Sequence, residues 1–479
     1  MRRSIVALLA AVLTLNIAPS AHASSQPKPG SLQFLLQDAQ SMLDAYGRIT
    51  APGGQLLNPA YLPALASQIP GVTLAQLLKI AASPTRPPLT AGALVPGWNV
   101  GNPLRASWDG TRGVETPVSF TNRYGALLRG TVYSPLPNAR DPYTGEVLTG
   151  PFPGVVLTPG SLQGSGGMYE WLGQDLAERG YVVLVYDVQG QGMSETLPHE
   201  SGSDLPFCFP FDAPKPLEML GCPGVPSQQE ANFVYGTLDA TDFFFSTPDA
   251  PYANPGRASA KVDAFNPLWE SFDRRPLEHE TAPGRSARFA IIGHSLGASA
   301  ISRVQGDDPR VSTVVALDKL RSGGGDDAIV PSVPALALQS EYSLLVTPTS
   351  ASEGIVANRE RVTGYDGWTA SGLDAMLIVP RASTHMEYTD IPLVMPASRY
   401  GQALSSVYTQ AWLDHWLKDA SIAPLLATSW SYLEPTGGGR WTPTRLDRSK
   451  LLSTRYCSAY LLHDDAAVRQ DEDVTGAGC

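Results

Sequence analysis

Short apolar runs alternate with amphipathic segments through the central part of the chain. Within each run the apolar residues are continuous, as in strands of a parallel sheet that is covered on both faces. The segments between them place apolar residues every three or four positions, which indicates helices. We therefore predict an α/β protein whose mostly parallel, doubly wound sheet carries helices on both faces. The strand-like runs are 155–158, 181–186, 289–292, 313–317, 335–339 and 376–379, and the helical stretches include 169–179, 230–245 and 399–418.

Changes in pattern divide the chain after its first residues into three parts. Helical spacing over residues 31–47 and 73–83 precedes a Pro/Gly-rich stretch, so we interpret residues 24–110 as an N-terminal extension that packs on the main domain. Residues 111–420 form that domain, which opens with a predicted β-hairpin. The remaining residues, 421–479, are interpreted as a C-terminal tail.

The main domain contains one long insertion. Residues 194–285 exceed what a single crossover helix needs, so we predict an insertion directly before the strand 289–292. The first part, residues 194–226, is rich in Pro, Phe and Gly. This character is typical both of a lid over an active site and of a rigid surface loop, and the sequence leaves both open.

The first 23 residues resemble a secretory signal peptide. Arg2 and Arg3 precede an apolar core at residues 5–17, and Ala21-His22-Ala23 forms a small-residue cleavage site. The apolar run is shorter than the roughly 20 residues that span a bilayer. We therefore expect an exported protein, extracellular or periplasmic, without stable membrane insertion.

Charge and cysteine content narrow the class of protein further. The net charge of −11 disfavours nucleic acid as a partner.

An even number of cysteines in an exported protein favours disulfides. Three pairings of the four cysteines are open, and nearest neighbours would join Cys208 to Cys222 and Cys457 to Cys479. Buried thiols are the alternative; metal binding is disfavoured because neither pair has zinc-knuckle spacing. The sequence does not specify an oligomeric state.

The chemistry of the chain centres on Gly293-His294-Ser295-Leu296-Gly297. This motif follows an apolar run and precedes a helical stretch, the context in which a G-x-S-x-G serine becomes an exposed nucleophile. Such a turn can also be a plain connection between a strand and a helix. The context favours Ser295 as a catalytic nucleophile.

A serine nucleophile needs a base, and the positions of the histidines leave one candidate. His385 alone follows the last predicted strand in a polar loop, so we predict that it is the base. His294 adjoins the serine and should point away from it. The others lie in the insertion (His199 and His279), in a helix (His415) or near the C-terminus (His463).

The base in turn needs a carboxylate to orient it. The chain order Ser, acid, His restricts this acid to residues between Ser295 and His385. Glu341 ends one apolar run, where ligands usually bind in such sheets, and is our first choice. Asp318 ends the preceding run and is the main alternative, and the loop with Asp326 and Asp327 stays open as well. Either Glu341 or Asp318 could instead be a solvated carboxylate at a strand end.

The oxyanion of an acyl-transfer reaction needs two N–H donors. We predict that the backbone amide of Leu296, directly after the nucleophile, is the first. The second should come from the loop 159–164, which is rich in Gly, with Ser161 as the preferred donor. A phosphate-binding loop is disfavoured because the lysine and the spacing of a P-loop are absent.

These motifs together resemble the α/β-hydrolase superfamily, in particular secreted dienelactone-hydrolase-like or lipase/cutinase-like serine esterases. The resemblance covers about residues 115–420. It is carried by Leu157-Thr158-Pro159-Gly160-Ser161, by the turn Tyr186-Asp187-Val188-Gln189-Gly190-Gln191-Gly192-Met193-Ser194, by the serine motif and by the region of His385 with the following helix. The chain departs from the family in Glu341, where Asp is commoner, and in the absence of His-Gly from the loop after the third strand.

The sequence thus predicts a secreted serine hydrolase that cleaves small or polymeric carboxylic esters through an acyl-enzyme intermediate. This chemistry requires no cofactor and no metal. A secreted serine peptidase and a non-catalytic binding protein of the same fold are the alternatives.

Overall fold

The structure is a computed structural model. It describes residues 31–82, 94–161, 165–196, 230–257, 261–323, 328–343, 346, 361–393, 396–464 and 467–475. The predicted signal peptide, three of the four cysteines (Cys208, Cys222 and Cys479), His199 and residues 197–229 of the predicted insertion lie outside these ranges.

A ten-stranded mixed sheet forms the centre of the molecule, with strand order β1-β2-β4-β3-β5-β6-β7-β8-β11-β12. The six strands from β4 to β8 along this order are parallel, whereas the strands at both edges pair antiparallel. The bounds are β1 Gly113–Thr121, β2 Leu127–Pro135, β3 Gly154–Thr158, β4 Val182–Tyr186, β5 Phe289–His294, β6 Thr313–Leu317, β7 Ala335–Leu338, β8 Ala375–Ile378, β11 Ala459–Asp464 and β12 Ala467–Asp471.

Both faces of the parallel strands are buried, because successive side chains point to opposite sides of a sheet. In β3, Val155 and Leu157 belong to one hydrophobic cluster and Val156 to the other. Helices α6 (Glu170–Glu178) and α11 (Gly401–Lys418) supply the first cluster with Trp171 and Trp412. Helices α7 (Glu230–Phe245), α8 (Leu296–Asp307) and α10 (Asp366–Ala370) supply the second. This two-sided cover explains the continuous apolar runs of the sequence.

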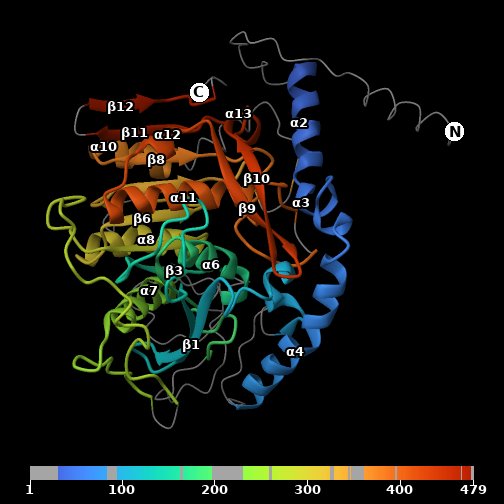
Figure 1. Ribbon diagram of the computed structural model, residues 1–479. Helices are drawn as coiled ribbons and strands as arrows, with labels where there is room; N and C mark the ends of the chain where they lie inside the picture. Colours follow the sequence, from blue (N-terminus) through green and yellow to red (C-terminus); the bar gives the residue numbers. More distant parts are fainter. Residues whose placement is uncertain are drawn as a thin grey trace, which may run out of the picture.

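The N-terminal extension forms an arm of helices along one side of the molecule, drawn in blue in Figure 1. It consists of α2 (Leu32–Asp44), α3 (Gly47–Thr50), η1 (Gln55–Leu57) and α4 (Tyr61–Ala82). Helix α4 starts twelve residues before the helical stretch that the sequence indicated at 73–83, and it contains Pro70. The short helices η2 (Trp98–Val100), η3 (Pro103–Arg105) and η4 (Gly166–Met168) follow.

The C-terminal segment is more than a tail. It begins with α12 (Ala423–Leu426) and a separate hairpin of β9 (Ser429–Gly437) and β10 (Arg440–Asp447), which lies beside the arm in Figure 1. After α13 (Arg448–Leu451), strand β11 pairs with β8 and extends the central sheet. Cys457, between these elements, is disulfide-bonded.

The predicted insertion contains a helix that lies on the sheet. Residues 230–245 of the insertion are helix α7, which packs beside α8 on the sheet. Among the helices that the structure describes, none has the length and apolar character needed to cross a bilayer. A π-helical turn, η6 (Arg361–Tyr365), leads into α10.

Candidate active site

Three side chains meet where parallel strands end. Ser295 follows β5, Asp318 follows β6 and His385 lies in the loop after β8. His385 Nε2 lies 2.8 Å from Ser295 Oγ, and His385 Nδ1 contacts Asp318 Oδ2. The side chain of Asp318 is only 4% exposed and that of His385 15% exposed, so the imidazole retains access to solvent while the carboxylate does not.

The turn at Ser295 has a strained backbone that only its glycine neighbours permit. Ser295 has φ of 55° and ψ of −117°, outside the regions that L-residues ordinarily occupy. A Cβ on Gly293 would lie 2.3 Å from the carbonyl oxygen of Gly297, and one on Gly297 would lie 2.4 Å from the oxygen of Pro159. Close backbone approach around the serine therefore requires both glycines.

Asp318 reaches His385 because the chain turns sharply after β6. Asp318 and Lys319 both have positive φ, 63° and 80°. The Asp318 amide donates to the carbonyl of Leu338 at 2.7 Å, and Ser340 Oγ donates to Asp318 Oδ2 at 2.9 Å. The ends of β6 and β7 thus hold one carboxylate oxygen against the imidazole.

The prediction that Glu341 orients His385 is wrong in geometry. Its carboxylate is buried against a cation from the C-terminal segment: Arg455 Nε donates to Glu341 Oε1 at 2.9 Å, and Ser453 Oγ donates to the same oxygen at 2.9 Å. The other oxygen accepts from the amide of Ala382. Glu341 therefore supports the loop that carries His385, and the alternative acid, Asp318, occupies the orienting position.

The predicted oxyanion donors border the serine. Leu296 is the first residue of α8, and the N–H groups of the first helical turn lack partners within the helix. Ser161 lies in the turn that follows β3. The preceding residue, Gly160, is so close that a Cβ there would lie 3.2 Å from Ser295 Cβ. Both predicted amides thus belong to segments that adjoin Ser295.

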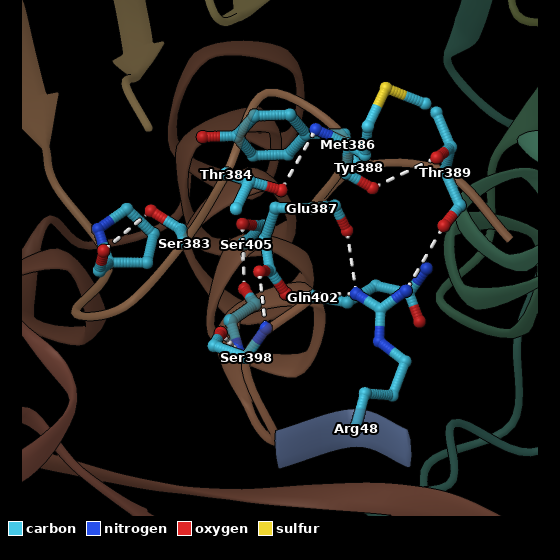
Figure 2. A network of polar contacts seen from close by, with 12 residues as sticks. Arg48, Ser383, Thr384, Met386, Glu387, Tyr388, Thr389, Ser398, Gln402 and Ser405 are labelled. Carbon is cyan, nitrogen blue, oxygen red and sulfur yellow. Dashed lines mark hydrogen bonds and ion pairs between the residues drawn. The ribbon is translucent and has the colours of Figure 1, made fainter. Parts of the chain in front are cut away.

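A second polar network fixes the loop after His385, and sequence reasoning missed it (Figure 2). Arg48 of the arm donates to the carbonyl oxygens of Glu387 and Thr389, at 2.7 and 3.0 Å, and pairs with Glu387 Oε1 at 2.8 Å. The amide of Ser398 donates to the other carboxylate oxygen at 2.7 Å. No local sequence signal links Arg48 with residues more than 300 positions away.

The remaining histidines of the described residues are not part of the triad. His415 Nδ1 contacts the carbonyl oxygen of Ala420 at 2.6 Å, and His463 of β11 pairs with Asp374, which directly precedes β8. His294 ends β5 directly before Ser295, and its ring lies 4.8 Å from that of His385 between centroids, tilted by 35°. In the part of the chain that the structure describes, no group of three or more His, Cys, Asp or Glu side chains is arranged to hold a metal ion.

Comparison with known proteins adds a partial relative. No model of a known protein family matches the chain. The chain is 31% identical over 132 residues to the uncharacterized protein PA2218 of Pseudomonas aeruginosa. The matched stretch is 26% of this chain and spans 33% of the length of that protein. The similarity therefore covers a part of each chain and carries no activity with it.

Proposed function

We propose that this protein is a serine esterase of the α/β-hydrolase superfamily. One observation carries the proposal: Ser295 Oγ, the imidazole of His385 and the carboxylate of Asp318 form a continuous chain of contacts at the carboxyl ends of parallel strands. This is the arrangement that activates a serine hydroxyl, and it is recognised by geometry rather than by residue order alone. The sheet order and the strained serine turn support the superfamily assignment.

The arrangement accounts for each proton in ester hydrolysis. His385 Nε2 takes the proton of Ser295 Oγ as this oxygen attacks the ester carbonyl, and the amides of Leu296 and Ser161 donate to the resulting oxyanion. The proton then passes from His385 to the alkoxy oxygen, and the alcohol leaves. Water attacks the acyl-enzyme while His385 takes its proton, and collapse of the second intermediate releases the carboxylic acid and restores Ser295.

The proposed substrate is a carboxylic ester, small or polymeric, and the proposed location is outside the cytoplasm. Export rests on the signal-peptide pattern of residues 1–23. A preference for apolar esters rests on the apolar residues of the insertion, which include Leu197, Leu205, Phe207, Phe209 and Phe211. These two parts of the proposal rest on the sequence alone.

A fluorophosphonate probe tests the nucleophile directly. We expect stoichiometric labelling of the wild-type protein at Ser295, because the probe reacts only with an activated serine. Ser295→Ala should remain unlabelled, and both Ser295→Ala and His385→Ala should lose ester hydrolysis by several orders of magnitude, since triad members act as a unit. Ser299→Ala, a buried serine one turn further along α8, is the matched control and should keep both properties.

A panel of p-nitrophenyl esters beside peptide amides tests the substrate class. Ester hydrolysis should exceed amide hydrolysis after allowance for the better leaving group. Faster cleavage of the amides would replace the esterase with a peptidase. A folded protein that neither reacts with the probe nor cleaves either substrate would be a non-catalytic member of the fold.

A further inference from the structure

We propose that Tyr169 and His294 are positioning residues that hold three segments in one rigid arrangement. These segments are residues 159–161 after β3 (the oxyanion loop, which carries the predicted donor Ser161), residues 293–297 around Ser295 (the serine turn) and the backbone of His385. The inference rests on the proposed esterase function and concerns residues that the triad chemistry itself does not use. Neither side chain touches the reacting atoms. Both act through the three segments that they connect.

The connection is a chain of three hydrogen-bond contacts. The amide of Gly160 donates to the hydroxyl of Tyr169 at 2.8 Å. The same hydroxyl lies 2.7 Å from His294 Nδ1, and His294 Nε2 lies 2.9 Å from the carbonyl oxygen of His385. Tyr169 comes from the start of α6, His294 from the end of β5 and His385 from the loop after β8. The contacts thus bridge elements that the chain separates by more than 90 residues.

The donors and acceptors of this chain fit only one assignment of protons. The carbonyl oxygen of His385 can only accept, so His294 Nε2 must carry a proton; in a neutral imidazole Nδ1 is then an acceptor, and the Tyr169 hydroxyl donates to it. Burial and the neighbouring His385 lower the pKa of His294 to about 3, so the ring is neutral at the pH of catalysis. The bridge therefore needs no counter-ion.

The position of Gly160 explains why this bridge affects the reaction. Its amide already donates to Tyr169, so it is not free to stabilise an oxyanion, and the next amide along the chain, that of Ser161, is the one we predict for this role. A Cβ on Gly160 would lie 2.7 Å from His294 Nδ1, so the loop, the imidazole and the serine turn are in direct contact. Loss of the Tyr169 hydroxyl would release the loop that carries the second oxyanion donor.

The bridge also sets the position of the base. His385 is held at its side chain by Asp318 and at its carbonyl oxygen by His294. Tyr169 and His294 are 1% and 2% exposed, so no water competes for these groups. Misplacement of catalytic groups by about 1 Å can cost on the order of 100-fold in rate. We therefore expect an effect on kcat rather than on substrate affinity.

Steady-state kinetics with p-nitrophenyl acetate separates positioning from simple structural support. Tyr169→Phe should lower kcat by roughly 10- to 100-fold and leave KM within about twofold. Tyr388→Phe is the matched control: this residue is also buried, its ring packs 5.6 Å from that of His294, and its hydroxyl donates to the Leu338 carbonyl at 2.8 Å. The Tyr388→Phe variant should lose about as much thermal stability as Tyr169→Phe and keep the wild-type kcat.

Substitutions of His294 test whether the two hydrogen bonds of its ring are what maintains kcat. His294→Leu removes both contacts and should lower kcat at least as far as Tyr169→Phe. His294→Gln carries one acceptor and one donor on its amide, so it should recover most of the loss. In the double variant Tyr169→Phe/His294→Leu the two effects should not add, because the residues act as one bridge. A kcat for Tyr169→Phe equal to that of Tyr388→Phe, or a raised KM at unchanged kcat, would overturn the inference.

NMR of protein labelled with ¹⁵N-histidine gives a readout that needs no activity. The His294 signals should show a protonated Nε2 and an unprotonated Nδ1 at neutral pH, and a proton on Nδ1 would overturn the bridge even if Tyr169→Phe failed to fold. An active wild type with an unaffected Tyr169→Phe would refute this inference alone. A wild type inert to both the ester and a fluorophosphonate would refute the proposed function first.

Discussion

At the scale of single residues, Asp318 and Glu341 show how two strand-end carboxylates acquire different roles. Both are buried and both follow a parallel strand. The positive φ of Asp318 turns its carboxylate toward His385, whereas Glu341 meets the guanidinium of Arg455. A carboxylate beside an imidazole stabilises the imidazolium of the transition state. The carboxylate of Glu341 instead neutralises the guanidinium of Arg455 and does not contact the imidazole.

Neutral amides at these two positions should therefore separate catalysis from stability. Asp318→Asn should fold and lose roughly 10³- to 10⁴-fold in kcat, because the amide no longer stabilises the imidazolium and favours the wrong tautomer. Glu341→Gln should retain kcat within about tenfold and lower the melting temperature, because Arg455 loses one anionic partner. Kinetics and thermal unfolding of both purified variants test this. The reverse ranking in kcat would return the acid role to Glu341.

The sequence indicated the serine, the base and the two candidate acids, because each follows a recognisable apolar run. It could not rank the acids, because the partner of Glu341 lies more than 100 residues further along the chain and shares no motif with it. Tyr169 was equally hidden: it appeared as the first residue of a helical stretch, and nothing in the local pattern revealed that its hydroxyl faces His294. Contacts between distant segments are the information that periodicity lacks.

At the scale of elements, the buried parallel strands were the most predictable part. Their apolar runs are continuous because both faces are covered, and the six predicted runs coincide with β3 to β8 to within one residue, apart from a two-residue extension of β5. Helix α7 has the predicted bounds. The strands β11 and β12 escaped prediction because the side chains of β12 are largely exposed and lack an apolar pattern.

Among its described residues, 386–393 and 396–400, the loop between His385 and α11 contains no helix or strand, and it is held by Arg48 of the arm. Burial raises the pKa values of Glu387 and Asp390, and Arg48 counteracts this effect in both. Arg48 lies 2.8 Å from Glu387 Oε1 and 3.7 Å from Asp390 Oδ1. Arg48 of the arm is therefore the counter-ion of two buried carboxylates, Glu387 and Asp390, in the loop that follows His385.

Removal of this counter-ion should destabilise the protein in a pH-dependent way. Arg48→Met leaves two buried carboxylates without it and should cost about 3 kcal/mol at pH 8. In the variant the folded-state pKa values of the carboxyls rise further above those of the unfolded chain, so the folded state binds more protons as the pH falls. The deficit relative to wild type should thus shrink toward pH 5, as measured by urea unfolding at several pH values.

Arg381→Met is the control for that measurement. Arg381 also joins the arm to the His385 region, through Asp44 at 3.2 Å, but the two side chains are 31% and 44% exposed. Exposed ion pairs contribute at most about 1 kcal/mol. A deficit for Arg48→Met that stayed constant between pH 8 and pH 5 would contradict the role assigned to the buried carboxylates.

At the scale of the whole molecule, one buried arginine ties the two ends of the chain to the centre. Arg455, from the C-terminal segment, has a side chain that is 1% exposed and that contacts both Asp38 of α2 and Glu341 of the loop after β7. Its guanidinium also lies over the ring of Tyr342, 4.7 Å from the centroid. The sequence suggested an extension and a tail at the two ends, and the structure joins both to the candidate active site through this residue.

The cost of breaking such a cluster depends on which member is removed. Arg455→Met should destabilise the protein by about 3–5 kcal/mol, because Asp38 and Glu341 remain buried without their cation. The triple variant Arg455→Met/Asp38→Asn/Glu341→Gln removes the charges together and should regain a large part of this loss, since a neutral cluster has no ion to desolvate. Urea unfolding of the single and triple variants measures both quantities. A triple variant less stable than Arg455→Met would show that the cluster is held by hydrogen-bond geometry rather than by charge balance.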